Sequence, residues 1–211
     1  MKTMICMPFA LALLAACGGA TTGGAPTVEE EMRFDDLQVE RDRVAAAYLA
    51  QSAVGAFPLP VAGTASYTGL ATLVMGLGDF DEDQVRSLSA GTFTASVDFA
   101  TATVDGTATD FLSVANPQEV FDDDSATPVL GAALAGSFTF TGPVAPSAGP
   151  ATLRGTITDP GFAQLGVDVP ILDQEILGTD QDVLRLDGEQ NITYSNGAPG
   201  WFVIDAIGTK D

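Results

Sequence analysis

Histidine is missing from the chain, and lysine is almost missing. The 211 residues contain no histidine, and the only lysines are Lys2 and Lys210. Histidine is the side chain that most often acts as a general base or metal ligand near neutral pH, so its absence argues against Ser-His-Asp, Cys-His and zinc sites. Lys210 stands one residue from the end, where chains commonly fray, which argues against a lysine nucleophile. We therefore expect no catalysis and no cofactor.

Cysteine is also scarce, because Cys6 and Cys17 are the only two in the sequence. If the chain is cut before Cys17, Cys6 is lost and a single cysteine remains, so no disulfide can form inside the mature chain. Cleavage before Cys17 would leave 211 − 16 = 195 residues. That length suits one domain with a hydrophobic core, whose stability must come from packing.

Positive charge is rare as well. Eight Lys and Arg residues face 28 Asp and Glu residues, which gives a formal net charge of −20. A surface of this sign repels the phosphate backbone of DNA and RNA, so we exclude nucleic acid as a partner. It would also repel anionic lipid, so the body of the domain should stand away from an anionic membrane surface.

The first sixteen residues have the anatomy of a signal peptide. Lys2 is followed by an apolar run of 11 residues, 4–14, that ends in small residues. A permanent membrane span needs roughly 20 apolar residues, so we expect this run to be removed. Leu14-Ala15-Ala16-Cys17 resembles the lipobox of bacterial lipoproteins. That resemblance implies a diacylglycerol on Cys17, and an ordinary secretory signal cut after Ala16 is the alternative.

Small residues follow the lipobox and form a flexible tether over residues 17–26. Acylation with two or more chains would anchor Cys17 stably at a bilayer. By resemblance to the enterobacterial sorting rule, Gly18 in place of aspartate implies the outer membrane.

Residues 27–58 form a helical lead segment. Thr27 and Glu30 stand at capping-box spacing, and the run to residue 53 has neither glycine nor proline. A helical stripe is formed by Phe34, Leu37, Val44 and Tyr48. The stripe predicts a helix that lies against the following domain, and a partner-binding helix or a partly ordered lead is the alternative.

Residues 59–211 alternate with the period of strands. Between residues 92 and 99 the odd positions are apolar and the even ones polar, which predicts a half-buried antiparallel strand. The strand candidates are residues 64–75, 92–99, 103–111, 137–141, 151–158, 192–194 and 201–207, and the poorly patterned region 167–186 has room for an eighth. A run of strands without helices favours a small antiparallel up-and-down β-barrel of about eight strands over a sandwich. The fold class is therefore mainly β, preceded by one helix and a lipid tether.

Two segments carry a family resemblance. They are Gly63-Thr-Ala-Ser-Tyr67-Thr-Gly69, and Gly91-Thr-Phe-Thr-Ala-Ser-Val97-Asp98-Phe99 leading into Thr103-Val104-Asp105-Gly106-Thr107. They resemble the barrel domain of transferrin-binding protein B and related surface lipoproteins, most clearly over residues 61–111. The resemblance implies a lipid-anchored outer-membrane protein that binds host proteins or metal-containing ligands. This chain has room for one barrel and lacks the handle domain that contacts transferrin, so transferrin binding and its residues are not carried over.

Candidate metal ligands are few. Asp79, Asp81 and Asp83 alternate as the first ligands of a calcium loop do, but Gln84 and Ala90 stand where an EF-hand needs glycine and glutamate. A solvated loop is the expectation, with a generic cation site as the weak alternative. Asp122, Asp123 and Asp124 form a second acidic cluster, which is expected to be a solvated tip. The alternative is that the two clusters together make an acidic rim that receives a basic partner. Trp201 is expected to be a core aromatic at the end of the barrel rather than a ligand platform.

Together these features predict a non-catalytic, lipid-anchored binding protein of the outer membrane or cell surface, whose barrel is the binding domain. Its partner, a protein or a small ligand, is not identified by the sequence. The alternative is a structural or assembly lipoprotein of the envelope that faces the periplasm.

Overall fold

The computed structural model describes residues 26–56, 58–78, 84–123, 125–144, 149–171 and 173–211. It opens with helix α1, Val28–Ser52. The predicted capping box is present, because the Thr27 side chain accepts from the backbone N–H of Glu30 while the Glu30 carboxylate accepts from that of Thr27. Neither described helix is long and apolar enough to cross a bilayer.

Within the described residues, ten antiparallel strands follow α1, interrupted by the six-residue helix α2, Pro117–Asp122. The strands are β1 Thr64–Leu77, β2 Val85–Asp98, β3 Thr103–Val114, β4 Leu130–Ala133, β5 Ala135–Pro143, β6 Thr152–Thr158, β7 Gln164–Pro170, β8 Asp173–Leu177, β9 Val183–Thr193 and β10 Pro199–Lys210. Their order in the sheet is β7-β6-β5-β3-β2-β1-β10-β9-β8, with β4 paired to β3 outside this path. Most neighbours in the sheet are therefore neighbours in sequence.

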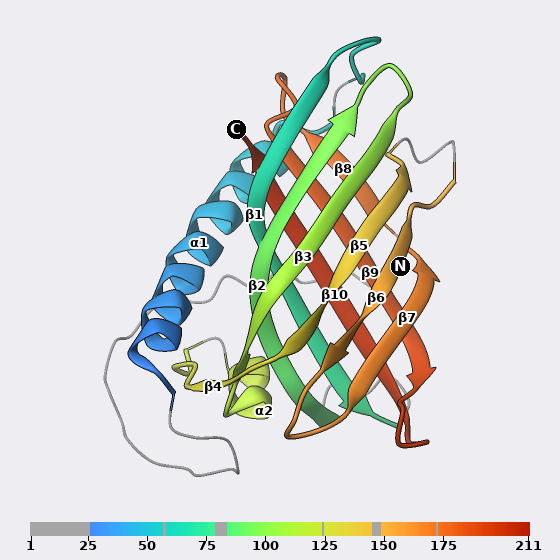
Figure 1. The fold of residues 1–211 in the computed structure, drawn as a ribbon. Helices are drawn as coiled ribbons and strands as arrows, with labels where there is room; N and C mark the ends of the chain where they lie inside the picture. The colour runs from blue at the N-terminus through green and yellow to red at the C-terminus, as the bar shows by residue number, and fades with distance from the viewer. Residues whose placement is uncertain (1–25, 57, 79–83, 124, 145–148, 172) are drawn as a thin grey trace.

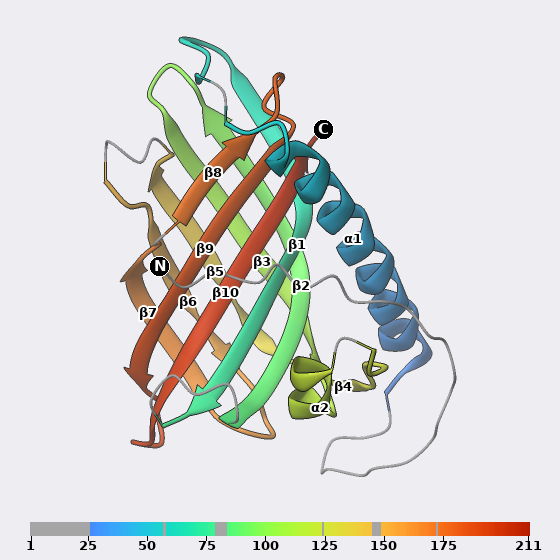
Figure 2. The same ribbon diagram turned by 180° about the vertical axis from the view of Figure 1, so that it is seen from behind.

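The sheet curls into a barrel (Figures 1 and 2). Its two end strands, β7 and β8, follow one another in the chain, and the first pairs with β6 while the second pairs with β9. At the rim, the Ser195 N–H donates to the carbonyl oxygen of Gln164 at 3.3 Å. If β7 and β8 are counted as one position and β4 is set aside, the wall has the eight positions that the sequence predicts.

Apolar side chains fill the inside of the barrel. Phe93 packs edge-on against Phe140 with ring centroids 5.5 Å apart, and Phe111 packs against Phe138 at 5.9 Å. All four rings are fully buried. Offset and edge-on aromatic pairs add to the free energy gained by burying their area. The core of the barrel is therefore made by its own side chains, as is usual for barrels of this size.

Helix α1 lies along the outside of the barrel, against β1, β2 and β10 (Figure 2). Its buried residues are Phe34, Leu37 and Val44, which belong to the predicted stripe. They join a second apolar cluster on the outer face of the wall, with Leu70 of β1 and Trp201 of β10 among its members. The helix thus begins near one end of the barrel and ends near the other, where β1 starts (Figure 1).

Two parts of the chain differ from the sequence prediction. The sequence indicates one helix, but α2 is a second, and its Val120 is buried in the outer cluster. Six residues are too few to show a helical period. The sequence leaves room for one strand in the region 167–186, whereas the structure has parts of β7, β8 and β9 there. Strand β9 is buried without a break from Val183 to Gly188, because both of its faces are covered, so no alternation marks it.

Candidate functional site

The structure places few of the predicted site residues. Cys17, Asp79, Asp81 and Asp83 all lie outside the described residues, so lipid attachment and the weak cation site stay predictions. The acidic cluster at 122–124 is described at its first two positions, both exposed near the end of α2. There Asp122 accepts a hydrogen bond from Gln118, and hydrogen bonds from Ser125 lower the pKa of Asp123. Across the part of the chain that the structure describes, no three acidic residues are grouped to hold a metal ion.

Trp201 is fully buried, as predicted, but it belongs to the outer cluster rather than to the core of the barrel. It stands directly opposite Gly76 of β1. Nearby, the Tyr194 hydroxyl lies between two backbone carbonyl oxygens to which it can donate. They belong to Gly76, at 2.9 Å, and Trp201, at 2.7 Å. Trp201 and Tyr194 therefore stabilise the wall rather than offer a surface to a ligand.

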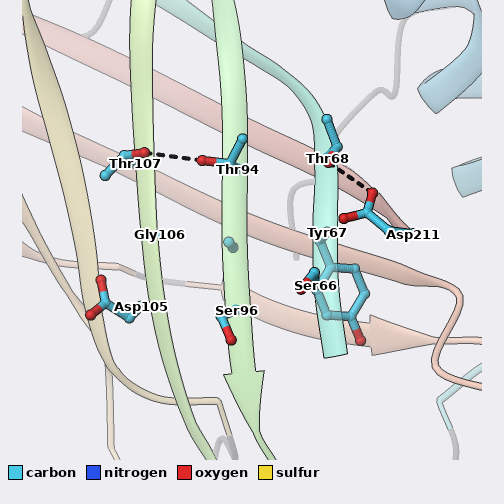
Figure 3. Close-up of a pocket in the computed structure, with 10 residues that line it drawn as sticks. Ser66, Tyr67, Thr68, Thr94, Ser96, Asp105, Gly106, Thr107 and Asp211 are labelled. Atoms are coloured by element: carbon cyan, nitrogen blue, oxygen red, sulfur yellow. Dashed lines mark hydrogen bonds between the residues drawn. The ribbon is translucent and has the colours of Figure 1, made fainter. Parts of the chain in front are cut away.

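A polar groove of about 380 Å³ crosses β1, β2 and β3 near the end of the barrel where β1 begins and β10 ends (Figure 3). We call it the hydroxyl groove. Its lining residues are Ser66, Tyr67, Thr68, Thr94, Ala95, Ser96, Asp105, Gly106, Thr107 and Asp211. Five of these ten residues carry aliphatic hydroxyls and two carry carboxylates. Because alternate residues of a strand share a face, the outward positions of three neighbouring strands meet here.

The strand register arranges the hydroxyls in two rows. The first row runs across four strands through Thr68, Thr94, Thr107 and Thr139, and the second runs through Ser66, Ser96, Asp105 and Thr141. Neighbouring members of a row are about 4.8 Å apart, the strand spacing of a β-sheet.

Hydrogen bonds link members of the groove to each other (Figure 3). Thr94 and Thr107 share one at 3.1 Å, and Thr68 donates to the Asp211 carboxylate at 2.8 Å. Hydroxyls can donate and accept, whereas carboxylates only accept, so the groove suits a ligand that carries hydrogen-bond donors. The alternation in the sequence identifies these residues as outward-facing, but only the register shows that they share one groove.

A second polar group lies on the outer face of β8, β9 and β10, and sequence reasoning missed it. Arg185 of β9 contacts Asp187 and Asp205 at 2.9 Å each, and Glu175 at 4.0 Å. Tyr48 of α1 covers the guanidinium, whose central carbon lies 5.3 Å from the ring centroid. The Tyr48 hydroxyl also donates to Glu175 at 3.2 Å. We call these five residues the Arg185 cluster; it joins the second half of α1 to the barrel.

Burial dominates the titration of the cluster. Asp187 is almost wholly buried, and this desolvation, together with the neighbouring Asp205 carboxylate, raises the pKa of Asp187 to about 7 despite the Arg185 guanidinium. Burial also raises the pKa of Asp205, against the effect of Arg185. In the hydroxyl groove, burial raises the pKa of the Tyr67 hydroxyl to about 12, so this side chain stays neutral.

The Asp187→Asn variant should make stability less dependent on pH. A carboxyl whose pKa is higher in the folded than in the unfolded chain binds a proton on folding, so stability is greatest below about pH 4 and falls as pH rises to 7. Because the pKa rises to about 7, this fall is about 4 kcal/mol at most for Asp187. Arg185 keeps Asp205 as a counter-charge in this variant, so we expect it to match the parent near pH 4 and to melt at a higher temperature at pH 8.

The matched control is Asp168→Asn, whose carboxylate is exposed in a pair with Arg154. It should leave the pH dependence of the melting temperature unchanged. Equal slopes for the parent and Asp187→Asn between pH 5 and 8 would contradict the role given to Asp187.

The fold defines the class of this protein: a small antiparallel β-barrel with a filled core and a helix packed on its outer wall. No model of a known protein family matches the chain, and no curated protein matches it. The resemblance to the barrel domain of transferrin-binding protein B therefore stays a prediction, since small barrels serve many unrelated families.

Proposed function

We propose that this protein is a lipid-anchored protein of the outer membrane or cell surface, and that its barrel is a non-catalytic binding domain. The hydroxyl groove is the binding site that the geometry favours. The observation that carries this proposal is the position of the groove relative to α1. The helix begins near one end of the barrel and ends near the other, where β1 starts and the C-terminus lies (Figure 1). The groove belongs to that second end, because Ser66, Thr68 and Asp211 line it.

The length of α1 separates a Cys17 anchor from the groove. A helix of 25 residues is roughly 37 Å long, and the proposed tether precedes it. An anchor at Cys17 would therefore hold the first turn of α1 toward the bilayer and leave the groove facing away from it. A binding site at this end of the barrel is open to partners that are not themselves at the membrane surface.

The distribution of polar side chains supports attachment through lipid rather than through the wall. In the described strands the inside of the barrel is apolar, and Thr and Ser gather on the outward face of β1, β2 and β3. Barrels that span a membrane have the opposite pattern, with an apolar band on the outside.

Removing the acceptor sulfur tests the anchor. Cys17→Ser should move the protein from the detergent phase to the aqueous phase in a Triton X-114 partition, because no acyl chain remains to hold it. A matched Ser125→Ala change, far along the chain from Cys17, should leave the partition as it is. If Cys17→Ser stayed in the detergent phase, the proposed anchor would be wrong.

Cysteine labelling tests display and orientation, because the proposed mature chain has no other free thiol. Ser96→Cys in the groove and Val129→Cys near α2 are both exposed positions. On intact cells a membrane-impermeant maleimide should label Ser96→Cys, and a bulky polyethylene-glycol maleimide should label it faster than Val129→Cys. Labelling of either only after the outer membrane is breached would favour the periplasm-facing structural lipoprotein instead.

A further inference from the structure

Helix α1 has a second apolar face that the barrel does not cover. Among the described residues, seven large apolar side chains are well exposed, and none of them lies in a strand. Four belong to α1: Val28 is 71% exposed, Met32 64%, Val39 70% and Leu49 50%. Single exposed apolar side chains are ordinary, but several on one element mark an interaction surface.

These residues lie along one side of the helix. Val28 and Met32 are four residues apart, Val39 follows seven residues after Met32, and the exposed Ala46 follows seven after that. At 100° per residue, this line is opposite the buried face of Phe34 and Leu37. We call Val28, Met32, Val39, Ala46 and Leu49 the outer stripe. Its seven-residue repeat is the spacing at which one helix packs along another.

The outer stripe is bordered by acid. Glu29, Glu31, Asp35 and Asp36 are exposed, and Asp35 and Asp42 take the repeat positions between its apolar residues. The three arginines of α1 form hydrogen bonds and ion pairs elsewhere on the molecule or within the helix. Arg33 donates to the carbonyl oxygen of Asp110, Arg41 pairs with Asp42, and Arg43 pairs with Glu40 and bonds to β1 and β10.

We propose that the outer stripe is a docking site for a basic amphipathic helix of another protein. Its apolar side chains would pack on Met32 and Val39, and its Lys or Arg side chains would reach Asp35 and the glutamates beside it. A second copy of this chain is disfavoured, because it would place carboxylate against carboxylate between two chains of net charge −20. An anionic bilayer is disfavoured by the same repulsion. This proposal is independent of the hydroxyl groove.

A synthetic peptide tests the site. The probe is a 21-residue helix of leucine and lysine heptads with a fluorescent label, titrated with the full mature-length chain at 0.15 M salt. Binding should weaken at least tenfold in Val39→Glu and in Met32→Glu. Each variant adds a negative charge, so attraction by charge alone predicts equal or tighter binding, and that result would overturn the proposal.

The matched control is Val61→Glu, which adds the same charge at a residue that is 93% exposed in the linker before β1. It should bind the peptide as the parent does, and a scrambled peptide of equal composition should bind the parent at least tenfold less tightly. Unchanged melting temperatures confirm that the variants are folded. The proposal would be overturned if the parent did not bind the peptide. It would also be overturned if light scattering showed a dimer that Val39→Glu dissociates, or if anionic vesicles bound the parent but not Val39→Glu.

Discussion

Replacing Gly76 with alanine is expected to destabilise the barrel by roughly 3 kcal/mol or more, at the upper end of what overpacking a core does. A Cβ at this position would lie 2.1 Å from Cε2 of the Trp201 indole. Gly76 and Trp201 are opposite one another on β1 and β10, and both are buried. Neither strand can move aside, because each is paired on both edges. Urea unfolding followed by tryptophan fluorescence measures the loss.

A double-mutant cycle identifies the clash as the cause. Trp201→Ala alone should cost about 3–5 kcal/mol, since it leaves a large cavity. If the indole is what an alanine at 76 meets, Gly76→Ala/Trp201→Ala should be no less stable than Trp201→Ala, which reveals strong coupling between the sites. Circular dichroism must replace fluorescence for these two variants. The control is Gly188→Ala, where a Cβ meets only Ile204 Cγ2 at an ordinary 3.6 Å. Additive losses would refute the steric explanation.

Arg185→Met is expected to destabilise the protein by about 3–5 kcal/mol at pH 8, the loss typical of removing one partner from a buried ion pair. The change leaves Asp187, with a side chain only 3% exposed, beside Asp205 and Glu175 without a counter-charge. It also removes the cation from the face of the Tyr48 ring and so weakens the attachment of α1.

The loss should be smaller at pH 5, because carboxyls without the guanidinium bind protons more readily and the buried charge disappears. Chemical denaturation at both pH values measures the difference. Arg154→Met removes an exposed pair with Asp168, both partners 64% exposed, and should have no measurable effect at either pH. A loss from Arg185→Met that does not change with pH would show that packing, rather than unpaired charge, is responsible.

The sequence predicts those elements whose faces have different surroundings. Residues 92–99 alternate because Phe93 and Val97 face the core while Thr94 and Ser96 face outward. The capping box and the stripe through Phe34 locate α1 for the same reason. Such patterns are local, so they can be recognised without knowledge of the tertiary structure.

The parts that escaped prediction depend on contacts between distant segments. Arg185 interrupts an apolar run and gives no sign that Asp205, twenty residues later, will neutralise it. The hydroxyl groove needs the pairing of Ser96 with both Ser66 and Asp105, which pattern alone does not supply. The sequence likewise does not show where β7 ends and β8 begins. The two strands follow one another in the chain, but β7 pairs with β6 and β8 pairs with β9.

The pairing of β1 with β10 governs when the molecule can fold during its synthesis. These strands form eleven register pairs, from Tyr67 with Lys210 to Leu77 with Gly200. Helix α1 packs against β1 and β10 together with β2. The first strand made must therefore wait for the last, and contacts of such high sequence separation form slowly. The wall on which α1 packs is therefore complete only after β10 has been made, a delay that would suit the export proposed above.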